Sequence, residues 1–138
     1  MTNISATRRG LDIALLMLCL FAAIGSVTIF EPCGPRPDGS FMVCHWAGRA
    51  ITGTGIALAL QAAFHLLAKS ASVKLGISIS MIPTTLLLFA IPHGLIDLCM
   101  REEMHCHTVM APAVTVLTIL LLLLLATDIF FQRARSIS

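Results

Sequence analysis

Four long apolar runs, separated by short polar segments, dominate the pattern of the chain. They cover residues 11–30, 46–68, 73–96 and 109–131. Each is close to the roughly 20 residues that an α-helix needs to cross a hydrocarbon layer about 30 Å thick. The runs are too long and too continuously apolar for the alternating strands of an outer-membrane barrel. The pattern therefore predicts an all-α integral membrane four-helix bundle, with residues 1–138 forming one transmembrane domain.

The composition agrees with this class. Hydrophobic residues make up 57% of the chain and charged residues 12%, against about 45–50% and about 25% in soluble domains. The lipid bilayer is therefore the first expected partner. The first apolar run is longer than the core of a typical secretory signal, so we expect a retained helix. The net charge of +2 gives no indication of nucleic-acid binding.

Basic residues between the runs predict the orientation of the bundle, because Lys and Arg concentrate in short cytoplasmic connections. One side carries Arg8, Arg9, Lys69, Lys74, Arg133 and Arg135, and the other carries Arg36, Arg49 and Arg101. We expect a multi-pass protein of the inner (cell) membrane with both termini in the cytoplasm. The loops at residues 31–45 and 97–108 then lie outside and contain four of the five cysteines, in a compartment that permits disulfides.

A short motif occurs once in each half of the chain. An acidic residue and a cysteine precede a spacer and then Met-x-Cys-His, so that Cys33 and Cys99 correspond, as do Cys44 and Cys106. The motif lies each time between two apolar runs that cross in the same directions. This predicts two repeated helical hairpins related by an axis along the membrane normal.

Three interpretations of the outer cysteines remain open. The first is structural, with disulfides Cys33–Cys44 and Cys99–Cys106, although 4 cysteines permit 3 connectivities. Each bond would stabilise its loop by about 2–4 kcal/mol. The second is a metal site, and the third is a membrane thiol–disulfide oxidoreductase. For the third, Arg49 could bind a quinone oxygen, although snorkelling to the interface also explains this arginine.

The metal alternative rests on ligand chemistry. Thiolate, thioether and imidazole together select copper(I), whereas zinc would use only cysteine and histidine. The candidate ligands are the same four cysteines together with Met42, His45, Met104, His105 and His107. His93 and Asp97, four residues apart in the third run, could extend such a site inward from one helical face. If the cysteines form disulfides, no cofactor is expected.

The remaining polar positions give no sign of catalysis. No Ser-His-Asp arrangement, phosphate-binding loop or paired carboxylate motif is found, which favours a non-enzymatic role. His65, Asp12 and Asp128 lie near the cytoplasmic ends of their helices, where solvation or helix capping explains them. Small residues recur at three- or four-residue intervals in the second run (Gly48, Thr52, Gly55 and Ala59). Such a stripe permits close helix association and suggests a membrane-protein partner or a homo-oligomer.

The order of these features resembles a known family. The elements are PC, then MVCHWAGRA, a lysine-bearing inner loop, LC and then MHCHTVMAP. They are similar to domain of unknown function 4418, an uncharacterised family of small four-helix membrane proteins of bacteria and archaea. The anchors are Cys33, Met42, Cys44, His45, Cys99, Cys106 and Pro112. The resemblance covers nearly the whole chain and implies the fold. Members of the family often lie beside export-type ABC permeases. We expect the chain to be an accessory or interaction subunit of a larger membrane complex.

Overall fold

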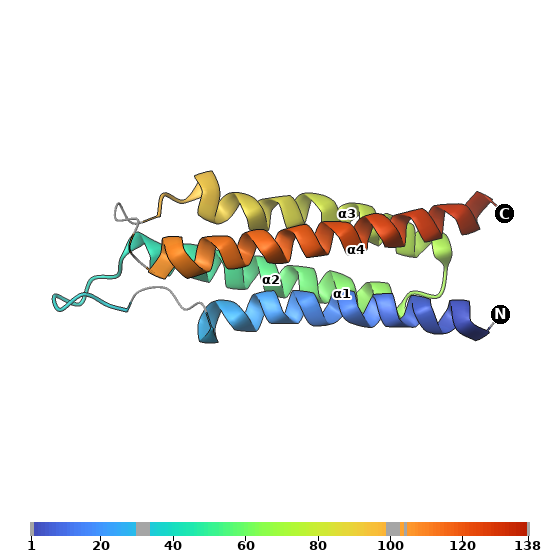
Figure 1. Ribbon diagram of the computed structural model, residues 1–138, viewed down its shortest axis with the longest axis horizontal. Coiled ribbons are helices and arrows are strands. Elements are labelled where there is room, and N and C mark those ends of the chain that lie inside the picture. Colours follow the sequence, from blue (N-terminus) through green and yellow to red (C-terminus); the bar gives the residue numbers. More distant parts are fainter. Residues whose placement is uncertain (1, 30–33, 99–102, 104, 138) are drawn as a thin grey trace.

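The computed structural model describes residues 2–29, 34–98, 103 and 105–137. Within them the chain forms four long helices and two π-helical turns. These are α1 (Thr2–Thr28), α2 (Val43–Leu67), α3 (Ala71–Ala90), η1 (Ile91–Leu95), η2 (Cys106–Met110) and α4 (Ala111–Ile137). The helices run alternately up and down, and both termini lie at one end of the bundle (Figure 1). We call this the termini end and the opposite one the loop end.

The all-α membrane fold expected from the apolar runs is confirmed. The described residues contain no strand, and four helical segments are long and apolar enough to cross a membrane. α1 and α4 extend well beyond the predicted runs at the termini end. Their polar ends stay helical because backbone hydrogen bonding along a helix continues past the hydrocarbon layer.

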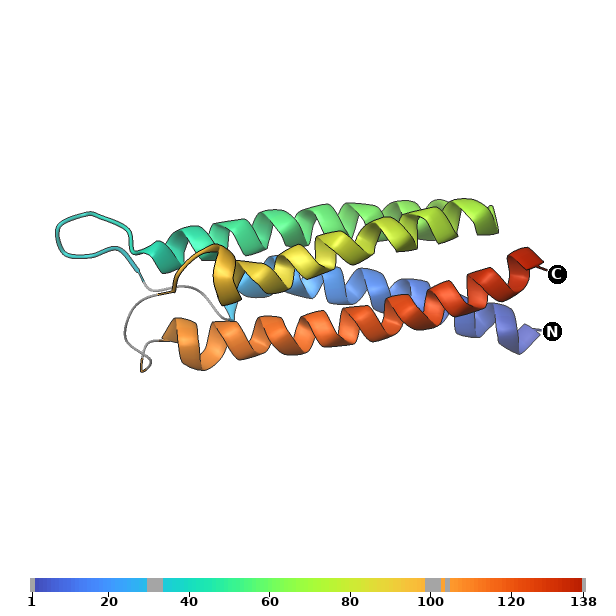
Figure 2. The same cartoon turned by 90° about the horizontal axis from the view of Figure 1, so that it is seen from above.

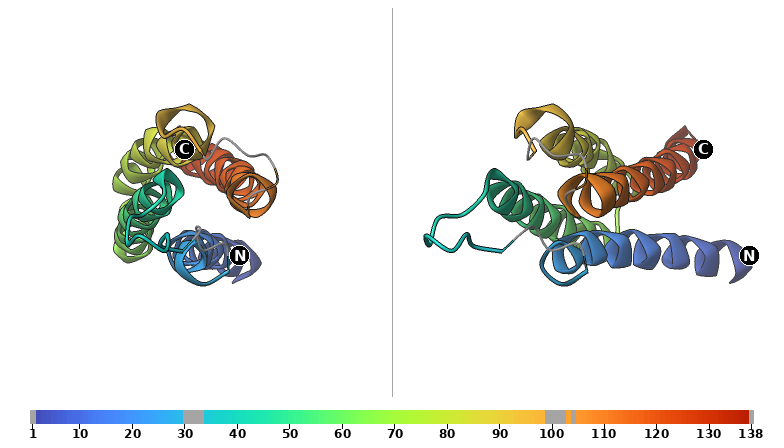
Figure 3. Two further views of the ribbon diagram at one scale, coloured as in Figure 1. Left: turned by 90° about the vertical axis from the view of Figure 1, so that its left-hand side faces the viewer. Right: turned by 60° about the vertical axis from the view of Figure 1, so that its left-hand side comes forward.

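The helices surround one continuous core. α1 packs mainly on α2 and α3 mainly on α4, with α2 beside α3 to complete the arrangement (Figures 2 and 3). Large, fully buried side chains fill the centre, among them Ile51, Leu58, Met81, Leu88, Leu121 and Leu125. Many other large apolar side chains are exposed on the outside, which suits a surface that contacts lipid.

The small residues of α2 serve packing inside the bundle. A Cβ atom added at Gly55 would lie 2.8 Å from the backbone nitrogen and Cα of Ala23 in α1, so only glycine permits this approach. One turn earlier, Thr52 and Ser26 share a hydrogen bond of 2.7 Å between their hydroxyls. The stripe that suggested association with a second chain is thus used, at these positions, between α1 and α2.

The loop end departs from regular α-helix at two prolines. Pro92 lies within η1, and Pro112 follows shortly after η2. Proline has no N–H to donate to the carbonyl four residues earlier, so a helix that contains one opens locally. α3 therefore passes into a π-turn that ends at Leu95, and helical structure resumes near Cys106.

Candidate functional site

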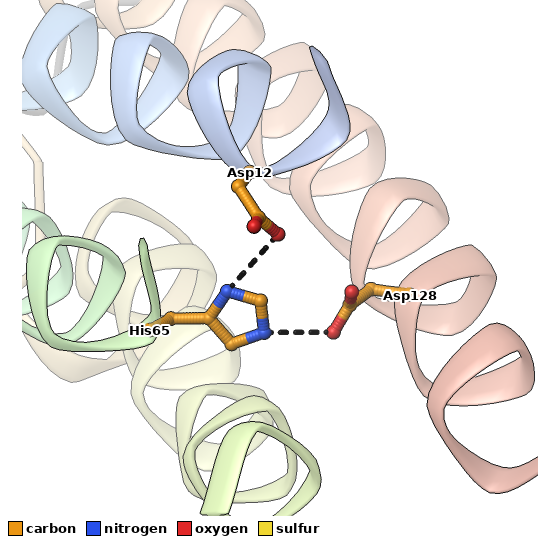
Figure 4. Close-up of side chains that lie close together, drawn as sticks. All are labelled: Asp12, His65 and Asp128. Atoms are coloured by element: carbon orange, nitrogen blue, oxygen red, sulfur yellow. Dashed lines mark hydrogen bonds and ion pairs between the residues drawn. The ribbon is translucent and has the colours of Figure 1, made fainter. Parts of the chain in front are cut away.

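The most distinctive polar feature of the structure is a buried ion pair between three helices at the termini end. His65 of α2 lies between Asp12 of α1 and Asp128 of α4 (Figure 4). Its Nδ1 is 3.3 Å from a carboxylate oxygen of Asp12, and its Nε2 is 3.0 Å from one of Asp128. The exposed fraction is 0% for His65 and 6% for each aspartate. The imidazole ring therefore bridges two carboxylates away from solvent.

Two side chains of α3 and one further side chain of α4 complete this arrangement. The ammonium of Lys74 in α3 donates to the other carboxylate oxygen of Asp12 at 2.5 Å. The hydroxyl of Ser78, also in α3, donates to Asp128 at 2.5 Å. Gln132, one turn beyond Asp128, donates its amide N–H to the remaining oxygen of that carboxylate at 3.3 Å. We call Asp12, His65, Lys74, Ser78, Asp128 and Gln132 the polar cluster, and it joins all four long helices.

The charges of the polar cluster balance when His65 carries a proton on both nitrogens. Each ring nitrogen faces a carboxylate oxygen, and an ionised carboxylate can only accept. A neutral imidazole has a single N–H and could satisfy one of the two contacts. Imidazolium and Lys74 together match the two carboxylates, so the cluster is neutral as a whole. Opposite charges buried beside one another offset part of the penalty that isolated charges incur away from water.

The same three residues could be considered as metal ligands. One ligand atom from each of Asp12, His65 and Asp128 falls within 4.8 Å of the other two. However, the carboxylates face opposite nitrogens of the ring (Figure 4), and one ion can be bound by only one of these nitrogens. Lys74 also occupies an oxygen of Asp12. The donor set fits a bridging proton better than a shared cation.

A cleft opens beside the polar cluster at the termini end. Its volume is about 1290 Å³, and its lining includes Asp12, Lys74 and Gln132 of the cluster. Segments of all four long helices and the connection after Leu67 contribute the rest of the lining. The cleft therefore borders the polar cluster directly, since three of the residues of the cluster belong to its lining.

Cys44 and Cys106, the described cysteines of the two motifs, lie at the opposite end of the bundle. Cys44 is buried in the first turn of α2 and is disulfide-bonded. Cys106 is fully buried at the start of η2. Cys33, Cys99 and Met104 lie outside the described residues. The connectivity of the cysteines, and a meeting of the two motifs near a common axis, therefore stay predictions.

The other candidate ligands have varied surroundings. His45 stacks on Phe41 with ring centroids 4.2 Å apart and meets the edge of Trp46. Met42 is the residue before the first turn of α2. His107 is half-buried and His105 is exposed. Because three of the candidate ligands lie outside the described residues, the soft-metal site stays a prediction.

The helical face expected for His93 and Asp97 is not formed. α3 passes into η1, which ends at Leu95, so Asp97 lies beyond the helix. His93 instead lies 3.0 Å from the carbonyl of Phe89 and 3.1 Å from the hydroxyl of Thr115 in α4. The prediction was wrong because it extended a regular helix through Pro92.

Sequence reasoning missed the polar cluster by treating its members one at a time. Solvation or capping was expected for Asp12 and Asp128, but both are buried against His65. The available signal was the presence of ionisable residues at a similar depth in three separate apolar segments, since such groups are costly in a membrane and tend to pair.

The family relationship agrees with this architecture. A family model described as Domain of unknown function (DUF4418) matches residues 15–131. The chain belongs to this family. No curated protein and no solved structure matches it.

The family match divides the termini end of the bundle. His65, Lys74 and Asp128 fall inside the matched range, whereas Asp12 and the arginines of the first turns of α1 precede it. In this DUF4418 chain, Asp12, one of the two carboxylate partners of His65, therefore lies outside the segment that carries the family match.

Proposed function

We propose that this DUF4418 protein is a non-catalytic accessory subunit of a larger complex in the inner membrane. The observation that carries the proposal is the polar cluster, because it joins all four helices and compensates its own charges. A buried network of paired charges and hydrogen bonds holds neighbouring elements in one arrangement. Such a bundle is suited to present a fixed surface to a partner.

The orientation expected from the basic residues fits this role. We propose that the termini end is cytoplasmic and the loop end extracytoplasmic, where Cys33–Cys44 and Cys99–Cys106 close the two loops. Disulfides in these loops require an oxidising compartment, which the proposed orientation provides. A covalent constraint at one end and the polar cluster at the other would then hold the two ends of the bundle.

α4 offers the surface on which a partner helix is expected. The segment from Leu120 to Leu125 consists of six leucines, and Leu123 is among the most exposed of them at 61%. Val116 and Ile119 extend the exposed apolar surface towards the loop end. An export-type ABC permease is the partner class that the family resemblance suggests, and a second copy of the chain is the alternative.

Site-specific photocrosslinking tests the proposal. A photoreactive amino acid replaces Leu123 in α4 or, as a matched control, Leu86 in α3, which is 50% exposed. We expect irradiation of intact cells to give one discrete protein adduct from position 123 and only lipid adducts from position 86. The photoreactive amino acid is also placed at Val116 and at Ile119. Lipid adducts alone from all three positions of α4 would refute the role of this surface.

The soft-metal and redox alternatives can be separated from the structural role of the cysteines. A disulfide-bonded Cys44 offers no thiolate, so a metal could bind only to reduced protein. Stoichiometric uptake of copper(I) by the reduced protein under anaerobic conditions, lost equally in Cys44→Ser and Cys106→Ser, would favour the metal site. Oxidation of the dithiol form of the protein by a quinone, with formation of quinol and without metal uptake, would favour the oxidoreductase.

A further inference from the structure

The cleft beside the polar cluster has an unusual charge distribution. Its lining contains five basic side chains and one carboxylate: Arg8, Arg9, Lys69, Lys74 and Arg135 against Asp12. That carboxylate already contacts both Lys74 and His65. The cleft therefore has a strong positive potential and favours an anion.

One arginine of the lining has unused hydrogen-bonding capacity. The Nε atom of Arg8 is buried and has no hydrogen-bond partner among the described residues. An unmet N–H away from water costs free energy, and an arginine side chain donates well to phosphate oxygens because its N–H groups form a planar fork. The buried Nε therefore indicates a site for an oxygen-rich anion beside α1.

The remaining lining is apolar. Ile4 and Ile13 of α1 and Leu66 and Leu67 of α2 lie in the same cleft as the basic groups. The cleft also lies where the membrane-spanning segments end, since one span finishes at Leu67 and the next begins at Ala71. A ligand at this depth has one part in the polar interface and another part in hydrocarbon.

We propose that the cleft binds one anionic phospholipid, with its phosphate against Arg8, Arg9 and Lys69 and its acyl chains along Ile13. A general excess of basic residues at one end of a membrane protein needs no cleft. Here basic groups from α1, from the connection after α2 and from α4 converge on one hollow with apolar walls. The inference requires no partner protein, so it can fail or succeed independently of the proposed accessory role.

Quenching of a tryptophan by brominated lipids tests the proposal. Trp46 is the only tryptophan, so Trp46→Phe gives a dark background. A reporter is then placed by Ile13→Trp in the cleft or by Leu86→Trp on α3 as a control outside the cleft lining. The full-length protein is reconstituted in phosphatidylcholine vesicles that contain brominated phosphatidylglycerol or brominated phosphatidylcholine.

The expected result is a preference for the anionic lipid at the cleft alone. Each basic residue near an anionic lipid favours it by about fivefold, so the reporter at position 13 should show at least this preference. The reporter at position 86 should show none. Arg8→Gln together with Arg9→Gln should remove most of the preference at position 13.

A second variant tests the cleft without changing any charge. A Cβ atom at Gly10, which lines the cleft, meets nothing within 4 Å, and the same holds at Gly76, which is not among the lining residues. Gly10→Phe should fill the cleft and abolish the preference, whereas Gly76→Phe should leave it unchanged. This pair stays informative if the arginine variants alter insertion or folding.

Three outcomes would overturn the inference. The first is equal quenching by the two brominated lipids at position 13. The second is a preference that survives Gly10→Phe. The third is a preference that inorganic phosphate at millimolar concentration abolishes, which would assign the cleft to a free anion instead of a lipid.

Discussion

Replacing His65 with leucine should destabilise the bundle more than any other single exchange at the termini end. The substitution keeps a side chain of moderate size but removes the group between Asp12 and Asp128, whose oxygens lie 3.3 Å and 3.0 Å from the imidazole. Two buried carboxylates then share one ammonium, that of Lys74. Breaking a buried ion pair from one side costs about 3–5 kcal/mol, and we expect a loss of unfolding free energy in this range.

A charge-restoring second substitution separates electrostatics from packing. In the His65→Leu background the polar cluster holds two negative charges and one positive charge. Adding Asp128→Asn makes it neutral again and leaves the Asp12–Lys74 pair intact. The double variant should therefore be more stable than His65→Leu alone, although Asp128→Asn by itself should destabilise the wild type. If the role of His65 is purely steric, Asp128→Asn should destabilise the His65→Leu variant as well as the wild type.

The buried thiol of Cys19 provides the assay. Its side chain is 0% exposed, so a maleimide fluorophore should label it only when the bundle opens. Unfolding in detergent is followed by this labelling, with the modified peptide confirmed by mass spectrometry. His93→Leu is the matched control, because His93 is exposed and at the loop end, and it should cost less than about 1 kcal/mol. A His65→Leu variant as stable as this control would refute the reasoning.

Three further predictions concern other parts of the bundle. Gly55→Ala should separate α1 from α2 and cost about 1–3 kcal/mol in the same assay, because its Cβ would lie 2.8 Å from the backbone of Ala23. Gly53→Ala, where a Cβ meets nothing within 4 Å, should be neutral or slightly stabilising, and equal effects of the two would contradict the close contact. Cysteines introduced at Ser40 and Ser70, both exposed, should react differently with an impermeant thiol reagent in intact cells, and modification of the cysteine at position 70 would reverse the proposed orientation. Protein isolated without reductant should be about 4 Da lighter than fully reduced protein if both loops carry disulfides, and any reactive thiol besides Cys19 would count against this.

The fold could be predicted from the sequence because one physical requirement dominates it. Backbone polar groups in hydrocarbon must be satisfied within the segment, so each long apolar run becomes a helix. The ends of the helices were harder to predict. Helix α1 starts at Thr2 although the apolar run starts near Leu11, since the polar residues between them can be helical in the interface. At the loop end, Pro92 ends regular helix earlier than the apolar run suggests.

The polar cluster was harder to predict because it depends on the orientation of each helix about its own axis and on the depth of each polar residue in the membrane. Asp12, His65 and Asp128 are separated by more than 50 residues along the chain, and only packing of α1, α2 and α4 determines that their side chains face one another. The apolar pattern constrains rotation weakly, since α2 and α4 carry apolar residues on every side. The packing of the helices therefore determines the polar cluster, and the sequence alone does not show that Asp12, His65 and Asp128 are buried together.

The polar cluster and the basic cleft share three residues, Asp12, Lys74 and Gln132, and this links stability to ligand binding. Lys74 contacts Asp12 within the cluster and also lines the cleft. An anionic headgroup that attracts Lys74 would weaken its pair with Asp12, but it would also compensate the arginines of α1 that otherwise repel one another. The first effect is small if Lys74 keeps both partners, because an ammonium has three donors. Anionic lipid should then stabilise wild-type protein, and it should do so less in an Arg8→Gln variant, whose cleft has lost one basic group without any change in the His65 contacts.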